Sequence, residues 1–383
     1  MPRLLYLLAL CNLVLGTGAF IINGILTPVS QALGVSVAAA GQAMTVYALS
    51  TALLAPLALV ATGGWPRKWA LVFGMLTFAL GNAVCALADS LAVLLAGRAL
   101  MGVGAMFTPL AAGIAVAVVE PARRGRALSL VFLGMSLSYV VGLPLGAWLG
   151  FQYGWHWPVA LVGGVAVLSA GALVLLCPKD IAAPGASFKG LGTVLGNAPV
   201  LWGLAMTLFY FVAIFVVFAY IGPVLQALTP MSSQRLSFTL MLFGVSGVIG
   251  TLSGGWANDR FGAPRTLKVQ LSVLGTMMLL VPLTQGSYGL MMAAFFIWGM
   301  AGFGMMTPQQ SRLAQMAPSQ APVLLSLNTS MLYFGTALGA AVGGALSGAV
   351  GFAHLAWVGV PFALAGLGTL WMSTHKTPLL KAA

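Results

Sequence analysis

The sequence has 383 residues, of which 60% are hydrophobic and only 5% are charged, whereas a soluble domain carries about 25% charged residues. A soluble fold of this length cannot bury so much apolar surface, so hydrocarbon must surround most of the chain. The net charge of +12 does not indicate nucleic-acid binding, because the basic residues are spread over short stretches between apolar segments. Long apolar runs also exclude a transmembrane β-barrel, whose strands alternate over about 10 residues.

Twelve apolar segments are long enough to cross a bilayer as helices, which takes about 20 residues each. In chain order they are 4–32, 37–62, 68–88, 91–119, 126–151, 157–177, 200–228, 235–257, 265–284, 287–313, 321–350 and 352–374. We predict an all-α membrane protein of two pseudo-symmetric six-helix bundles. The N-terminal bundle covers 1–177 and the C-terminal bundle covers 200–383, and the longest connection, 178–199, is the predicted linker.

The distribution of Lys and Arg predicts that both termini lie in the cytoplasm, because cytoplasmic loops carry the excess of basic residues. With this orientation, fourteen of the 16 Lys and Arg fall in cytoplasmic segments and only Arg235 falls in an outer loop. The last one, Arg98, lies inside the fourth segment. We therefore expect a multi-pass protein of the bacterial inner membrane, with the linker in the cytoplasm.

Small residues recur every four positions in two of the predicted helices. The fifth segment carries Gly134, Ser138, Gly142, Gly146 and Gly150, and the eleventh carries Gly335, Gly339, Gly343, Ser347 and Gly351. Such stripes let helix backbones approach closely. Matching stripes in the two halves predict a pair of structural repeats, as in many secondary transporters. The alternative is that small residues are simply common in a chain with 49 glycines.

Several motifs, taken together, resemble those of the major facilitator superfamily. They are Gly254-Gly255-x-x-x-Asp259-Arg260-x-Gly262 after the eighth segment, Arg98-Ala-Leu-Met-Gly102 in the fourth, and Gly142-Leu-Pro144-Leu-Gly146 in the fifth. The chain looks like the twelve-helix drug/proton antiporter branch, near bacterial sugar-efflux and chloramphenicol-type exporters. This resemblance implies a secondary active transporter that exports a small organic solute (a drug, sugar or metabolite) by alternating access.

Two positions depart from the pattern of this family. Gly63 stands where the first signature loop usually has an aspartate, which puts the conformational lock of the N-terminal half in doubt. Ala19 stands where related exporters often carry a proton-binding acid. All four acidic residues are expected in loops or at helix ends, namely Asp89, Glu120, Asp180 and Asp259. Because proton coupling needs a group whose pKa crosses the working range, carboxylate-based coupling is doubtful here.

Arg98 is the most unusual polar residue in the predicted spans, because it is a charged side chain well inside one of them. A buried guanidinium is costly unless it is paired or hydrogen-bonded. One interpretation is that Arg98 binds carbonyls and hydroxyls of the first span, near Asn12, Thr17 or Asn23, and braces the bundle. The other is that it attracts an anionic or strongly polar solute into a water-filled cavity.

The resemblance implies a central cavity lined mainly by the first, fourth, seventh and tenth spans. The candidate substrate-binding residues are Asn23, Gln42, Tyr47, Arg98, Phe107, Tyr210, Phe211, Tyr220, Asn328 and Tyr333. Candidate conformational-switch residues are Arg67, Lys68, Asp259 and Arg260, and candidate packing or gating residues are Gly142, Pro144, Gly146, Gly335 and Gly339. Gln309 and Gln310 of the tenth span are noted as further cavity residues; the alternative is that they are only solvated, because they lie near its cytoplasmic end.

Proline is expected to interrupt five of the spans, at Pro28, Pro109, Pro144, Pro223 and Pro308. Pro28 and Pro223 occupy equivalent places in the two halves, where they either hinge an outer gate or simply end a helix.

No catalytic, metal-ligating or phosphate-binding pattern is found in the sequence, so we expect neither an enzyme nor a bound cofactor or metal. The expected partners are a small-molecule substrate and membrane lipid, without nucleic acid, and the protein is expected to function as a monomer. Two alternatives remain open. One is a uniporter or exchanger of an anionic metabolite, favoured by the charge of +12 and the missing acids. The other is a non-transporting membrane sensor of the same fold.

Overall fold

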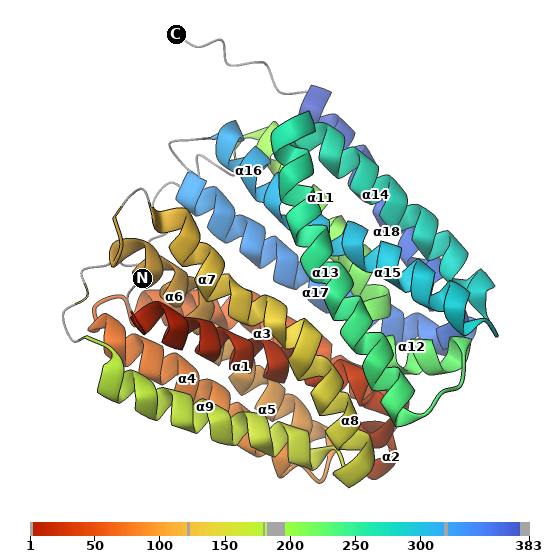
Figure 1. Ribbon diagram of the computed structural model, residues 1–383, viewed down its shortest axis with the longest axis horizontal. Coiled ribbons are helices and arrows are strands. Elements are labelled where there is room, and N and C mark those ends of the chain that lie inside the picture. The colour runs from red at the N-terminus through yellow and green to blue at the C-terminus, as the bar shows by residue number, and fades with distance from the viewer. Residues whose placement is uncertain (1–2, 121–122, 179–180, 182–195, 318–320, 376–383) are drawn as a thin grey trace. The chain divides into compact units, whose positions relative to one another are not determined.

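The computed structural model describes residues 3–120, 123–178, 181, 196–317 and 321–375, and this part of the chain is helical, without strands (Figure 1). It contains twelve helical spans that are long and apolar enough to cross a membrane. They are Arg3–Gly24, Val37–Ala61, Arg67–Ala86, Leu91–Ala117, Arg126–Tyr153, His156–Leu176, Ala198–Phe218, Ser233–Phe261, Ala263–Thr284, Tyr288–Met316, Val323–Val350 and Phe352–Thr374. The predicted all-α fold with twelve spans is confirmed.

Contacts between residues group the chain into two compact units. Unit 1 comprises Met1–Ser187 with Met231–Gly244, and unit 2 comprises Phe188–Pro230 with Val245–Ala383. The division into bundles 1–177 and 200–383 stays a prediction, and most of the predicted linker 178–199 lies outside the described residues.

Unit 1 begins with α1 (Arg3–Gly24) and the short α2 (Leu26–Ala32). The following elements are α3 (Val37–Ala61), α4 (Arg67–Ala86), α5 (Leu91–Gly104), α6 (Phe107–Ala117), α7 (Arg124–Leu137), the π-helix η2 (Ser138–Gly142), α8 (Leu143–Tyr153) and α9 (His156–Leu176). Within this unit α1 packs against α7, η2, α8 and α9, and α4 packs against α5 and α9 (Figure 1).

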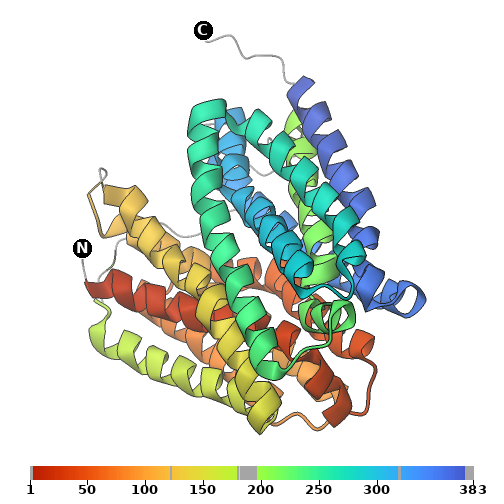
Figure 2. The same cartoon turned by 45° about the vertical axis from the view of Figure 1, so that its right-hand side comes forward.

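Unit 2 repeats this order of elements. It contains α11 (Ala198–Phe218), α12 (Ile221–Leu228), the greater part of α13 (Ser233–Phe261), α14 (Ala263–Leu280), the 3-10 helix η3 (Val281–Thr284), α15 (Tyr288–Gly304), α16 (Met306–Met316), α17 (Ala321–Val350), the 3-10 helix η5 (Phe352–His354) and α18 (Leu355–His375). Here α11 packs against α17 and α18, and α14 packs against α15 and α18 (Figure 2).

Helix breaks lie inside the fourth and tenth spans and directly after the first and seventh, and each break ends three residues before a proline. The breaks end at Ile25, Met106, Tyr220 and Met305, and the prolines are Pro28, Pro109, Pro223 and Pro308. Proline lacks an N–H and its ring clashes with the carbonyl four residues earlier, which explains the common offset. These four predicted interruptions are confirmed. Pro144 differs, because it lies in the first turn of α8 directly after the π-helix.

Two of these breaks have nearly the same backbone geometry. Ile25 has φ −119° and ψ 22°, and Tyr220 has φ −116° and ψ 25°. Each is followed by a short helix, α2 or α12, with the proline at its third position. The first and seventh spans therefore end in equivalent bends, as expected for structural repeats.

In unit 1 the stripe of small residues on α7, η2 and α8 faces α1. A Cβ atom at Gly134 would overlap the carbonyl oxygen of Ala9, and one at Gly142 would overlap the side chain of Thr17. Further along, a Cβ atom at Gly146 would overlap Ile21. The predicted close approach of these helices is confirmed.

In unit 2 the corresponding stripe lies on α17 and faces α11. A Cβ atom at Gly335 would lie 2.5 Å from the carbonyl oxygen of Leu208, and one at Gly339 would lie 2.7 Å from that of Val212. The last member of the predicted stripe behaves differently. Gly351 follows the end of α17 with φ +74° and has no neighbouring atom within 4 Å. It terminates the helix, since glycine readily adopts positive φ.

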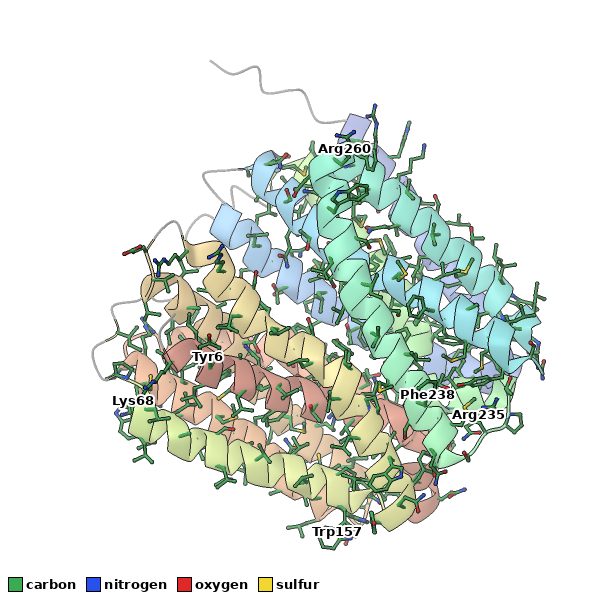
Figure 3. All side chains as sticks on the ribbon, in the orientation of Figure 1. Tyr6, Lys68, Trp157, Arg235, Phe238 and Arg260 are labelled. Atoms are coloured by element: carbon green, nitrogen blue, oxygen red, sulfur yellow. The ribbon has the colours of Figure 1, made fainter. Side chains whose placement is uncertain are left out.

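Basic and aromatic side chains mark the ends of several helices. Figure 3 shows Lys68 at the start of α4 and Trp157 at the start of α9, and it places Arg235 near one end of α13 and Arg260 at the other. Such positions fit residues that meet the headgroup region of a bilayer. The orientation of the termini remains a prediction.

Candidate functional site

The acidic residues that the structure describes all lie on the surface. Asp89, Glu120 and Asp259 are exposed, and Glu120 forms an ion pair with Arg123 in which both side chains are largely solvated. Asp180 lies outside the described residues. Among the described residues no group of three or more His, Cys, Asp or Glu could hold a metal ion. No acidic side chain is therefore buried in the described part of the spans.

Arg98 of α5 is fully buried and donates three hydrogen bonds to backbone carbonyls. Nη1 lies 2.9 Å from the oxygen of Gly18, Nη2 lies 2.7 Å from that of Ala19, and Nε lies 3.1 Å from that of Ala43. The guanidinium also lies over the ring of Tyr47, 4.7 Å from its centroid. A cation–π contact of this kind becomes stronger when water is excluded.

These contacts support the bracing interpretation of Arg98, since one side chain ties α5 to both α1 and α3. Two of the partners are backbone carbonyls of the first span, directly after Thr17, as this interpretation expects. The difference is that none of the three bonds goes to a hydroxyl and that α3 takes part through Ala43. The carbonyls are available because a carbonyl oxygen has two lone pairs, and a helical hydrogen bond uses only one of them.

Both positions that lack an expected acid supply a backbone acceptor to an arginine. The carbonyl of Ala19 accepts from Arg98, and the carbonyl of Gly63 accepts from Nη2 of Arg67 at 3.1 Å. Arg67 and its neighbour Lys68 are buried at the start of α4. In contrast to a carboxylate, a carbonyl holds a guanidinium without taking part in titration.

Asn23 of α1 presents the opposite situation, a buried amide without a hydrogen bond. The residue is fully buried, and neither Nδ2 nor Oδ1 has a hydrogen-bond partner among the described residues. It lies one helical turn after Ala19 and two residues before the break at Ile25. An unsatisfied buried polar group costs about 1–3 kcal/mol, so Asn23 is well suited to bind a solute or a water molecule.

Asn12, on the same helix, is fully engaged. Its Nδ2 donates to the carbonyl of Val131 at 3.2 Å, and its Oδ1 accepts from the hydroxyl of Thr108 at 2.8 Å. These three residues, the polar node of unit 1, join α1, α6 and α7, and each polar atom of the Asn12 side chain has a protein partner.

An equivalent polar node joins α11, α16 and α17 of unit 2. The Thr207 hydroxyl donates to Oδ1 of Asn328 at 2.6 Å, and Nε2 of Gln309 donates to the Thr207 hydroxyl at 2.8 Å and to the carbonyl of Gly203 at 2.7 Å. The alternative that Gln309 is only solvated is wrong, because the break at Met305 turns α16 so that Gln309 is buried against α11.

The tyrosine hydroxyls of α11 and of the adjoining break are engaged in helix packing. Tyr210 donates to the carbonyl of Gly302, and Tyr220 donates to the carbonyl of Ala340 at 2.9 Å. Both rings are buried. These hydroxyls tie α11 and the adjoining break to α15 and α17, and substrate binding by the two residues stays a prediction.

The remaining candidate substrate-binding and switch residues lie in several places. The Tyr47 ring lies under the guanidinium of Arg98, and Phe211 packs edge-on against Tyr210 with ring centroids 4.6 Å apart. Phe107 is buried, whereas Gln42 and Tyr333 are partly exposed. Among the switch candidates, Asp259 and Arg260 are exposed at the end of α13.

The sequence analysis overlooked Thr207 and treated Arg312 as a cytoplasmic surface charge. Arg312 is instead only 6% exposed, and its Nη1 has no partner among the described residues. The signal for this residue was the spacing Gln309-x-x-Arg312 after Pro308, because residues three apart share one face of a helix.

Comparison with known proteins gives a consistent picture. Residues 8–331 match the Major Facilitator Superfamily. The chain is 33% identical over 369 residues to the "Inner membrane transport protein YdhP" of Escherichia coli strain K12, covering 95% of this chain and 94% of that protein. It is 27% identical over 382 residues to a "Probable sugar efflux transporter" of Pasteurella multocida strain Pm70, covering 97% and 93%.

Two solved structures share the fold. The first is a bacterial homologue of the human lysosomal transporter Spinster in an inward-facing, occupied conformation, with a TM-score of 0.78, 17% identity and coverage of 98% of this chain and 97% of that one. The second is the xylose transporter XylE from Escherichia coli, with a TM-score of 0.75, 13% identity and coverage of 99% and 98%. At these identities the similarity concerns the fold alone.

Proposed function

The chain belongs to the Major Facilitator Superfamily, and we propose that it exports a small organic solute, such as a drug, sugar or metabolite, across the inner membrane by alternating access. Its relatives include proteins named as an inner membrane transport protein and as a sugar efflux transporter. The proposal includes both termini in the cytoplasm, function as a monomer without a cofactor, and no enzymatic activity.

The observation that carries this proposal is the unpaired amide of Asn23. Burying this amide without a hydrogen bond is unfavourable, and a solute with hydroxyl or carbonyl groups that binds to it supplies the missing hydrogen bonds. The position beside the break at Ile25 is important, because a bend between α1 and α2 is a place where a helix can move. Asn23 is thus a substrate contact that conformational change can expose and cover.

We further propose that transport does not use a carboxylate as the proton carrier. Each described acid is exposed. Ala19 stands where the family resemblance implies a proton-binding acid, and its carbonyl accepts a hydrogen bond from Arg98. Exchange against another solute or movement down the solute gradient fits this arrangement better than carboxylate-based proton antiport.

The test is flux of radiolabelled glucose, xylose, gluconate and chloramphenicol in proteoliposomes, with and without an imposed pH gradient. We expect flux of at least one solute that is unchanged by the gradient and reduced at least tenfold by Asn23→Leu. Because the substitution removes an unpaired polar group, the variant should be as stable as the wild type or more stable. Flux that requires the gradient would refute the proposed coupling. No flux of any solute in this panel would contradict export and favour a membrane sensor.

A second candidate function, a uniporter or exchanger of an anionic metabolite, is favoured by one specific observation. Arg312 is a buried cation in the tenth span without a counter-ion among the described residues. An ionisable residue at such a position is a functional-site hypothesis by default.

A further inference from the structure

We propose that Gln309 and Arg312 of α16 form a binding site for an anionic group, a carboxylate or phosphate, that has a hydrogen-bond donor beside it. This inference defines a substrate class for the proposed transport function. It rests on that function only where it identifies the bound anion as a transported solute.

The first argument is the state of Arg312. The side chain is 94% buried, its Nη1 atom is inaccessible to solvent, and that atom has no hydrogen-bond partner among the described residues. A buried charge costs several kcal/mol unless it is paired. Retaining a guanidinium with an unsatisfied buried nitrogen at this position is explained if an anion binds there.

The second argument is that no acidic side chain pairs with this charge. The elements that pack against α16 include α11, α14, α15 and α17. None of these four contains an Asp or Glu, and their only charged residues, Arg265 and Lys268 of α14, are exposed and of the same sign as Arg312. The element α13 also reaches α16, at Gly255, and it carries Asp259, which is exposed and forms no ion pair with Arg312 in the described part of the chain. A negative charge for Arg312 is therefore not supplied by these helices.

Gln309 supplies a fixed acceptor on the same face of α16. Its Nε2 is held by two hydrogen bonds, to Gly203 and Thr207, which orients the amide. Its Oε1 is buried and has no partner among the described residues. A ligand that satisfies both side chains needs an anionic oxygen for Arg312 and an O–H or N–H donor for Gln309. Hydroxy acids, sugar acids and phosphorylated polyols have both groups.

Comparison with unit 1 indicates that this arrangement is not required by the fold. The equivalent node of Asn12, Thr108 and Val131 is closed by its own hydrogen bonds. The helix equivalent to α16 is α6, and it contains no charged residue. Unit 1 joins the equivalent helices without a charged residue, so bracing alone does not require a cation on α16. The charge on α16 is a specific feature of unit 2.

The same chemistry is available from two sources, a soluble anion and the phosphate and hydroxyl groups of a phosphatidylglycerol headgroup. The experiment separates them by measuring thermal unfolding of the purified full-length protein in phosphatidylcholine nanodiscs. Sodium gluconate, inorganic phosphate and glucose are added separately, and a further set of discs contains phosphatidylglycerol. Glucose is the uncharged control, because it carries several hydroxyl groups but no carboxylate.

Three variants complete the design. Arg312→Met keeps the length of the side chain but not its charge, Arg312→Lys keeps the charge, and Arg265→Gln removes an exposed charge from the same unit as the control. We expect gluconate to raise the unfolding temperature of the wild type and of Arg265→Gln, and glucose to have no effect. In Arg312→Met the affinity for gluconate should fall at least tenfold, with a smaller fall in Arg312→Lys.

Ligand-free Arg312→Met should be at least as stable as the wild type, since it no longer buries an unpaired charge. A response to phosphatidylglycerol alone, lost in Arg312→Met, would support the anion site and assign it to lipid. The inference is overturned if no anion acts through Arg312, if glucose acts as gluconate does, or if ligand-free Arg312→Met is destabilised as a lost brace would be. Because binding is read without flux, this result is independent of the transport test.

Discussion

A Gly339→Ala substitution on α17 tests the close packing of α11 and α17 directly. The added Cβ would lie 2.7 Å from the carbonyl oxygen of Val212 and 2.9 Å from Cβ of Phe215. Since the first of these atoms belongs to the backbone, the new methyl group cannot be accommodated by a change of rotamer, and α11 has to move. The matched control is Gly348→Ala on the same helix, where no atom lies within 4 Å of the added carbon.

The expected magnitude follows from two opposing terms. Replacing glycine by alanine in a helix stabilises it by about 1 kcal/mol, and overpacking a closely packed contact costs about 1–3 kcal/mol. Gly348→Ala should therefore stabilise the protein by up to about 1 kcal/mol, and Gly339→Ala should be neutral or destabilising by up to about 2 kcal/mol. The difference between the two variants, about 1–3 kcal/mol, isolates the contact because the helix-propensity term cancels.

The assay is the free energy of unfolding in mixed micelles as the fraction of denaturing detergent is raised, followed by far-ultraviolet circular dichroism. Flux through the same variants shows whether the contact also matters for transport. If Gly339→Ala is stabilised as much as Gly348→Ala, α11 and α17 do not approach as closely as described, and the interpretation of the stripe of small residues is refuted.

Three further predictions concern single side chains. Arg98→Lys should lose at least one carbonyl contact of the guanidinium and destabilise the protein by about 1.5–3 kcal/mol, measured in the same micelle assay; unchanged stability would contradict the bracing role. Tyr220→Phe should cost about 0.5–1.5 kcal/mol while leaving flux unchanged, because its hydroxyl is used by Ala340; a large loss of flux with normal stability would restore it as a substrate contact. Burial raises the pKa of the Cys177 thiol, an effect that the nearby Lys68 ammonium opposes in part, so a maleimide should label the native protein at pH 7 much more slowly than the unfolded protein, as mass spectrometry can show.

The sequence was sufficient to predict the spans, the breaks and the stripes, because each depends on local composition. A run of about 20 apolar residues is long enough for a membrane helix, and a proline such as Pro28 favours a break because it lacks an N–H. The breaks are predicted less well than the spans, since Pro56 and Pro361 lie inside unbroken helices. Gly339 could be placed in a helix contact for the same reason, since small residues in a regular register allow close approach.

Most hydrogen-bond partners could not be predicted from the sequence, because they depend on which helices meet. Carbonyls of the first span were expected around Arg98, but the carbonyl of Ala43 on α3 was not, because a backbone carbonyl is present at every position and leaves no mark in the sequence. For Gln309, a solvated side chain was one of two interpretations, since its distance from the end of the span was known but the direction of α16 after the break at Met305 was not.

The two missing acids now have a common physical consequence. Where a carboxylate would hold Arg67 or Arg98, the carbonyls of Gly63 and Ala19 accept the hydrogen bond. A carboxylate partner can be protonated, which releases the arginine and couples helix contacts to pH. A carbonyl cannot, so these two contacts hold equally well at any pH that leaves arginine charged. These two arginine contacts therefore do not couple the packing of the helices to pH. In the proposed transport cycle, a solute that binds the unpaired polar atoms of Asn23, Gln309 and Arg312 would favour the conformation in which it binds most tightly.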